Sequence, residues 1–267
     1  MWTPLPNTDC VSASIEFSRL VKTHGKTKVL SNLDLIVEPG ITLGLVGTNG
    51  AGKTTLIKCM LDFCHLDNGK ISIFGVPHTQ VIARSQLVYL PEHFQAPGYQ
   101  TGERFLRLML QLHNQSYERT AALKLFNRLG LEPKALAQRI RTYSKGMAQK
   151  LGLVLCLLAD RPLMVLDEPM SGLDPRSRIQ FKELMSEQKQ SGKTLFFSTH
   201  MLNDVESLCD QIAILHDGQI HFVGTPEHCC KTYHADSLEA AYMNCIESKP
   251  PNSNSTKKQS AKLQSVA

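Results

Sequence analysis

Residues 47–54 form a glycine-rich stretch, Gly-Thr-Asn-Gly-Ala-Gly-Lys-Thr, that most constrains how this chain can fold. The stretch matches G-x-x-x-x-G-K-[ST], the pattern of a phosphate-binding loop. The apolar segment 41–46 before it suits a buried strand, and residues 55–61 after it have the pattern of a helix. A strand, a glycine loop and a helix in this order leave unpaired backbone N–H groups that can bind phosphate. The alternative, a chance glycine turn, is less consistent with these flanking segments.

The loop residues have separate expected roles in binding a nucleotide. Lys53 should reach the outer phosphates, and the hydroxyl of Thr54 should bind Mg²⁺. Gly50 and Gly52 allow positive φ angles and a close approach of the backbone to the ligand. The predicted phosphate-binding residues are therefore Gly47, Thr48, Asn49, Gly50, Ala51, Gly52, Lys53, Thr54 and Thr55.

Two acidic residues, Asp167 and Glu168, follow the apolar segment 163–166. An acid at the carboxyl end of a strand beside a phosphate loop can hold Mg²⁺, so Asp167 is a predicted metal partner. Glu168 is a candidate general base for a hydrolytic water, a role that contributes ~10²–10⁴-fold in rate. An Asp-Glu pair by itself could simply cap a turn. Downstream of residues 47–54, it indicates a nucleoside triphosphatase.

The length of 267 residues suits one large α/β domain or two small ones, and the 42% hydrophobic content is ordinary for a globular protein. No apolar run approaches the ~18 residues that a membrane-spanning helix needs. Residues 1–6 lack the basic start and the apolar block of a secretory signal. We therefore expect a cytoplasmic protein that is either free or held at a membrane by a partner.

The net charge of +5 is concentrated in a polar tail, residues 248–267, which contains four lysines and no acid. Subtracting those four lysines leaves +1 for the rest of the chain, so no nucleic-acid surface is expected. The tail is predicted to be disordered and solvated, and weak contact with anionic lipid is the alternative.

The eight cysteines include no pair of C-x-x-C units, so a zinc site has little support. Cys59, Cys64 and His65 lie close together in the sequence. Because the two cysteines fall in or just after an apolar helix, we expect reduced core thiols rather than metal ligands.

The order of the remaining segments predicts an α/β fold. Residues 14–17 and 33–37 suit two antiparallel strands, residues 67–69 a turn, and residues 70–75 a short strand. Between a strand at 86–90 and Ser144 the pattern becomes helical, which indicates a helical insert at about 91–143. After the insert, the pattern predicts a helix that begins at Ser144, a strand at 163–166, a helix at 176–190 and a strand at 194–198. A hairpin about Asp217-Gly218 and two short helices at 226–246 follow.

Three further motifs make a family resemblance specific. Residues 143–151 resemble the LSGGQ signature of ABC-type ATPases, residues 171–175 resemble the D-loop, and Ser198-Thr199-His200 resembles the end of the switch strand. The order and spacing of the motifs match that family from about Ile15 to Gly224. The resemblance implies a parallel-sheet core with an N-terminal antiparallel subdomain and a helical insert. It also implies that residues 10–247 form one ATP-binding domain.

The resemblance implies roles for single residues. In such proteins two copies pack head to tail around ATP, with Gly47–Thr54 of one copy opposite Ser144 and Gly146 of the other. Ser144 is expected both to cap a helix and to face the γ-phosphate, although a cap alone is the simpler interpretation. His200 is expected to orient the attacking water. The alternative interpretation of His200 is a histidine at the end of a strand that bonds only to its own loop. Asp174 is expected at the dimer interface.

The chain departs from the family pattern in three ways. His24 stands where a tyrosine often stacks on adenine, so base recognition is expected to be weaker. Glu92 replaces the usual glutamine, and its carboxylate can bind Mg²⁺ or water while adding negative charge near the phosphates. The signature has Lys145 and Met147 where glycine and glutamine are commoner. These variants resemble ATPase subunits of bacterial exporters, in which the membrane subunit is a separate chain.

The first hypothesis is therefore an ATP-hydrolysing subunit of an ABC exporter that binds ATP and Mg²⁺ as a homodimer. It would lie on the inner face of the cell membrane, beneath separate multi-spanning membrane subunits. A soluble ABC ATPase acting on ribosomes or nucleic acid is one alternative, but the interval between Lys53 and Ser144 holds only a modest helical insert, and no basic stripe is visible. The other alternative, a nucleotide switch without turnover, is disfavoured by Glu168 and His200.

Overall fold

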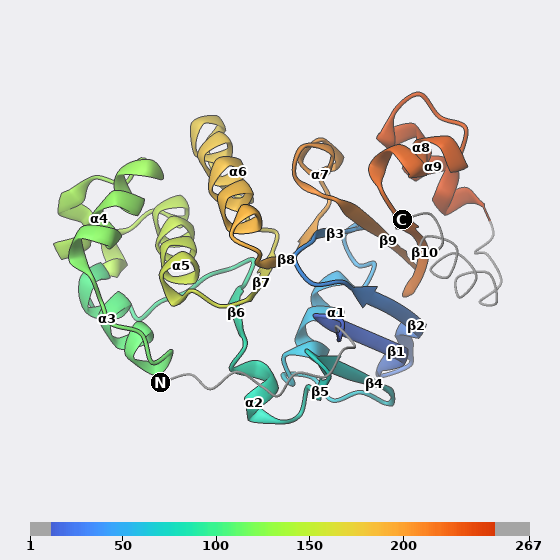
Figure 1. The fold of residues 1–267 in the computed structure, drawn as a ribbon, viewed down its shortest axis with the longest axis horizontal. Coiled ribbons are helices and arrows are strands. Elements are labelled where there is room, and N and C mark those ends of the chain that lie inside the picture. Colours follow the sequence, from blue (N-terminus) through green and yellow to red (C-terminus); the bar gives the residue numbers. More distant parts are fainter. Residues whose placement is uncertain (1–11, 249–267) are drawn as a thin grey trace.

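The computed structural model describes residues 12–248, and its centre is a six-stranded sheet (Figure 1). Five strands run parallel, and the sixth, β10, pairs antiparallel with β9 through the predicted hairpin at Asp217-Gly218. Parallel strands are buried on both faces, which explains their nearly continuous apolar sequences. In order across the sheet the strands are β10 (Gln219–Gly224), β9 (Gln211–His216), β3 (Thr42–Val46), β8 (Thr194–Thr199), β7 (Leu163–Asp167) and β6 (Leu87–Leu90).

A second, four-stranded antiparallel sheet is formed by the N-terminal segments, in the order β2 (Thr27–Val37), β1 (Ile15–His24), β4 (Asn68–Ile73) and β5 (Val76–Pro77). The antiparallel pairing is confirmed, but β1 and β2 are longer than predicted. The reason is that their polar residues also pair, on a face that water can reach. The prediction of a turn at 67–69 was wrong in part, because Asn68 pairs with Val21 and begins β4.

Helix α1 (Lys53–Met60) packs in a hydrophobic cluster that joins the two sheets. Phe17 of β1 and Phe196 of β8 meet in this cluster with ring centroids 6.2 Å apart. Alternate residues of β7 face opposite sides of the sheet, so Val165 belongs to this cluster while Leu166 packs against the other helices. The phosphate loop is thereby held between two rigid layers.

The opposite face of the sheet is covered by α5 (Lys145–Ala159) and α6 (Pro175–Gln190), with α3 (Gly102–Leu112) and α4 (Arg119–Arg128) packed beyond them (Figure 1). The helical insert is confirmed as two helices followed by 3₁₀ turns at Pro133–Ala137 and Ile140–Thr142. Its first residues, 91–101, contain no helix. The short helix α2 (Val81–Arg84) was not predicted.

The last part of the chain forms α7 (Leu202–Leu208), α8 (Pro226–Thr232) and α9 (Leu238–Glu247), which pack together beside β9 and β10 (Figure 1). Across residues 12–248, no helix has both the length and the apolar character that crossing a membrane requires.

The cysteines in that range all carry free thiols, and burial raises the pKa of Cys59 to about 12. Apart from Ser248, the tail predicted at 248–267 lies outside the described residues, and the boundaries of the domain stay a prediction.

Candidate active site

The predicted phosphate loop connects β3 to α1. Gly50 has φ +87° and Gly52 has φ +110°, a region that other residues rarely adopt. Gly47 is restricted for another reason: a Cβ there would lie 2.4 Å from the carbonyl oxygen of Leu215. The loop leads directly into the first turn of α1, whose first N–H groups have no carbonyl partner within the helix. Free N–H groups and the positive end of the helix dipole together favour an anion.

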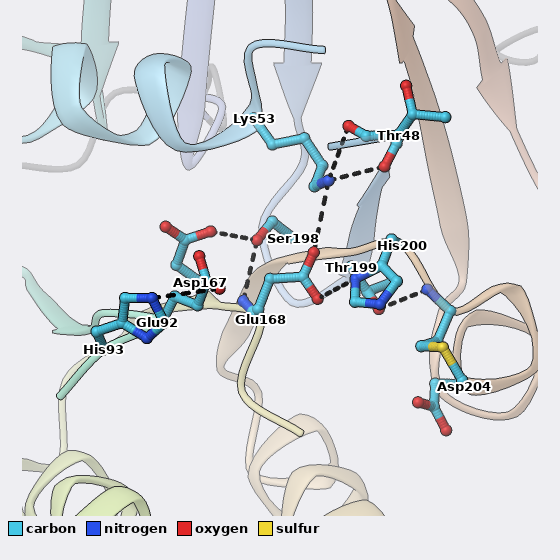
Figure 2. Close-up of polar contacts among 12 residues, drawn as sticks. Thr48, Lys53, Glu92, His93, Asp167, Glu168, Ser198, Thr199, His200 and Asp204 are labelled. Atoms are coloured by element: carbon cyan, nitrogen blue, oxygen red, sulfur yellow. Dashed lines mark hydrogen bonds and ion pairs between the residues drawn. The ribbon is translucent and has the colours of Figure 1, made fainter. Parts of the chain in front are cut away.

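The side chain of Lys53 lies over this loop. Its Nζ donates to the carbonyl oxygens of Gly47, at 2.7 Å, and Thr48, at 3.3 Å. The same atom lies 3.5 Å from Oε1 of Glu168 (Figure 2). The side chain is buried, so its positive charge is held at a fixed place beside the loop. This position suits a contact with the outer phosphates of a nucleotide.

Asp167, at the end of β7, is buried, and only one of its two carboxylate oxygens has a hydrogen-bond partner among the described residues. Its Oδ1 accepts from the hydroxyl of Ser198 on β8, while Oδ2 has no hydrogen-bond partner among residues 12–248. Burial raises the pKa of Asp167, and the charges of Glu92 and Glu168 raise it further, while the hydrogen bond from Ser198 and the nearby hydroxyl of Thr54 lower it. A buried carboxylate in such an acidic setting is the environment that a bound cation would stabilise.

The residues at this place fit Mg²⁺. Thr54 and Asp167 offer two oxygen ligands close together, and Glu92 is near enough to affect the pKa of Asp167. The described part of the chain contains no cluster of three His, Cys, Asp or Glu side chains that could hold a metal by itself. Mg²⁺ binds through one or two carboxylates together with substrate phosphates and water, a role that Asp167 and Thr54 could fill.

Glu168 lies between Lys53 and His200 (Figure 2). Its Oε2 is 2.9 Å from Nδ1 of His200, and its backbone N–H is bonded to Oγ of Ser198 at 3.0 Å. Its φ of +47° is unusual for a residue with a side chain. Backbone strain of this kind often occurs at functional sites. The alternative for His200, a bond to its own loop, is not what the structure shows, since the ring contacts Glu168, directly after β7.

Ser144 and Asp174 each begin a helix. Oγ of Ser144 accepts from the backbone N–H of Met147 at 3.2 Å and so caps α5. Asp174 caps α6 through Ser177, and its Oδ2 also lies 3.2 Å from Nζ of Lys150. The hydrogen bonds from Ser177 lower the pKa of Asp174. Within residues 12–248, no hydrogen bond or ion pair joins Ser144 or Asp174 to the phosphate loop, so their predicted roles toward ATP and a second copy stay predictions.

The two other departures from the family pattern lie at the ends of strands. His24 is exposed at the end of β1, beside the turn that leads to β2. Glu92 follows β6, is 40% exposed, and has its Oε1 3.8 Å from Nε2 of His93. Their predicted roles in binding adenine and Mg²⁺ also stay predictions.

Two residues with contacts to this site were missed from the sequence. Ser198 was noted only as part of a motif, yet it bonds to both acids across the sheet. A hydroxyl at the end of a buried apolar strand was the signal that could have identified it. Tyr242 of α9 approaches Thr48. Burial raises the pKa of Tyr242, and Thr48 lowers it by a smaller amount. The Tyr242 hydroxyl has no hydrogen-bond partner within the described residues. Nothing in the sequence near Tyr242 indicates that contact.

Comparison with known proteins gives the same assignment as the motifs. A family model described as ABC transporter matches residues 30–171. An uncharacterized ABC transporter ATP-binding protein of Synechocystis sp. is 38% identical over 213 residues, which cover 77% of this chain and 60% of that protein. The chain thus spans less than two thirds of that relative. A Nod factor export ATP-binding protein of Rhizobium etli is 33% identical over 217 residues, which cover 80% of this chain and 68% of that protein.

A solved structure of an ATP-binding subunit of an ABC transporter is also similar. It matches 86% of this chain and 98% of its own, with a TM-score of 0.78 and 31% identity. This likeness confirms the fold class predicted from the sequence. The chain belongs to the ABC transporter family.

Proposed function

We propose that this protein is the ATP-hydrolysing subunit of an ABC exporter and acts as a homodimer beneath separate membrane subunits. The observation that carries the proposal is the position of Glu168, held between Lys53 and His200 at the phosphate loop. A purely binding module has no need of a carboxylate at that place. The export of a Nod factor by the Rhizobium system named above supports the direction of transport, while the cargo is chosen by the membrane subunits.

The chain's own residues can carry out hydrolysis in a simple sequence. The loop N–H groups and Lys53 bind and orient the phosphates of ATP. Glu168 accepts a proton from the attacking water, and His200 holds that carboxylate and the water in line with the γ-phosphate. Thr54 and Asp167, with Glu92 nearby, would hold Mg²⁺, which would supply charge neutralisation on the phosphate oxygens.

The second half of each site comes from another copy of the chain. Ser144 and Gly146 lie at the start of α5, where the helix dipole favours an anion, and Ser144 is exposed. In the proposed dimer this end of α5 covers the γ-phosphate bound by the partner. ATP that binds the closed dimer more tightly than the monomer shifts the population toward the dimer, and hydrolysis of that ATP lets the dimer open.

Ser144→Ala tests this arrangement. The variant loses a helix cap, at a cost of ~0.5–2 kcal/mol, and also the contact with the partner's nucleotide. We expect ATP binding by the monomer to remain and the ATP-dependent dimer to be lost, as measured by sedimentation with and without ATP. Ser237→Ala is the matched control, because Ser237 caps α9 in the same way. Equal dimerisation by both variants would contradict the role of Ser144.

A patch of exposed apolar side chains supports a membrane partner. Phe63, Val81 and Ile82 are 71%, 75% and 58% exposed. An ion pair between Asp62 and Arg84, at 3.2 Å, joins the end of α1 to α2 and brings the two segments together. Exposed apolar patches of this kind mark interaction sites. Residues 63, 81 and 82 are named the α2 patch below. It is the surface that we assign to the membrane subunit.

The experiment that tests the function is fractionation of the host cell. The wild-type protein is expected in the membrane fraction. The double variant Phe63→Glu/Ile82→Glu is expected in the soluble fraction with its ATPase activity intact. Ile179→Glu, which places the same charge at another exposed apolar residue, is the control. Sedimentation of the wild-type protein with ribosomes instead of membranes would contradict the transporter assignment and favour the soluble alternative.

A further inference from the structure

Asp204 is a buried acid on α7 that the proposed chemistry does not use. The residue is 6% exposed and lies four positions after His200 (Figure 2). Its Oδ1 is 2.9 Å from Nζ of Lys182, and its Oδ2 is 4.0 Å from Nη1 of Arg178, both on α6. Oδ2 has no hydrogen bond within the part of the chain that the structure describes. The carboxylate is thus shared between two cations of a neighbouring helix.

The segment between His200 and Asp204 is short and held at both ends. Before it, Oγ1 of Thr199 on β8 accepts from the N–H of Met201 at 3.0 Å. After it, the N–H of Asp204 donates to the carbonyl oxygen of Met201 at 3.3 Å, where α7 begins. The His200 ring itself is 47% exposed, and its one hydrogen bond among the described residues is with Glu168. The place of the ring therefore depends on the backbone that carries it.

The cations come from the helix that follows the D-loop. Arg178 and Lys182 are four residues apart and share one side of α6, and Asp174 caps the start of that helix. Any displacement of α6 therefore acts on the Asp204 carboxylate. An apolar residue would pack α7 equally well, because buried ion pairs add little net stability. What an ion pair adds is a specific alignment of one helix on the other.

We propose that Asp204 is a positioning residue, whose ion pairs with Lys182 and Arg178 align α7 on α6 and so hold His200 against Glu168. Through these pairs, a change at the D-loop reaches the switch histidine. This inference rests on the proposed hydrolysis of ATP by this site. It assigns to Asp204 no contact with nucleotide or with the reacting atoms.

The test is a double-mutant cycle on ATP turnover with Asp204→Asn and His200→Ala. Alone, Asp204→Asn is expected to lower kcat by ~10- to 100-fold, as for other displacements of a catalytic group, with KM for ATP nearly unchanged. In the His200→Ala background it is expected to change kcat very little, since the residue that it positions is already absent. A purely structural role would lower the folded fraction and reduce kcat equally in both backgrounds.

Three further variants keep the outcome clear. Lys182→Asp combined with Asp204→Lys reverses the closer pair and is expected to recover part of the lost turnover. Glu187→Gln, which removes the ion pair of α6 with Arg128 at 2.7 Å, is the control and should leave kcat unchanged. If Asp204→Asn does not fold, Lys182→Met removes the closer cation instead, at a side chain that is more exposed than Asp204. Unchanged kcat in folded Asp204→Asn, or an equal loss in both backgrounds, would overturn the inference. A wild-type protein without turnover would instead contradict the proposed function.

Discussion

Lys53→Ala is expected to abolish tight binding of ATP. In the structure, Nζ of Lys53 is held over the loop by two carbonyl oxygens, where it can meet the outer phosphates. A hydrogen bond to a charged group contributes ~1.5–3 kcal/mol, so losing this lysine should weaken binding by roughly 10- to 150-fold. Titration calorimetry or fluorescence of a nucleotide analogue measures the change.

The control for this variant is Lys58→Ala. Lys58 lies on the same helix α1, but its side chain is exposed and belongs to the last turn. Lys53→Ala also leaves the buried carboxylate of Glu168 without its cation at 3.5 Å, so circular dichroism must confirm that the variant folds. A folded Lys53→Ala protein with unchanged affinity for ATP would contradict the assignment of the loop.

Glu168→Gln is expected to lower the rate of ATP hydrolysis by ~10²–10⁴-fold, the usual contribution of a general base. Glutamine has nearly the same shape and can still bond to His200, so the site should remain intact. It cannot take the proton of the attacking water. ATP should therefore bind normally and stay uncleaved.

The same variant tests the second copy of the chain. Because the closed dimer is released by hydrolysis, Glu168→Gln should accumulate as an ATP-bound dimer, visible by gel filtration. Glu206→Gln, at an exposed acid of α7, is the control and should hydrolyse ATP at the normal rate. A Glu168→Gln protein that binds ATP but stays monomeric would count against the head-to-tail dimer. One that hydrolyses ATP normally would count against Glu168 as the base.

The parts of the site that are encoded in short continuous segments could be predicted from the sequence. The loop at 47–54 and the cap at Ser144 depend on a few neighbouring residues, so each has a local pattern. The order of the strands also indicated which acids would lie near the loop, since parallel strands end at one edge of a sheet. The structure brings Lys53, Glu168 and His200 together beside Asp167, and their roles toward ATP stay predictions.

The tertiary structure alone decided the contacts between residues far apart in the chain. Ser198 bonds to Asp167 and Glu168 from a neighbouring strand, Asp204 pairs with Lys182 of another helix, and Tyr242 approaches Thr48 from the last helix. No pattern of neighbouring residues specifies such pairs, because they follow from how strands and helices pack around the common core. The sequence could predict which groups bear the chemistry, and only the packing shows which side chains hold them in place.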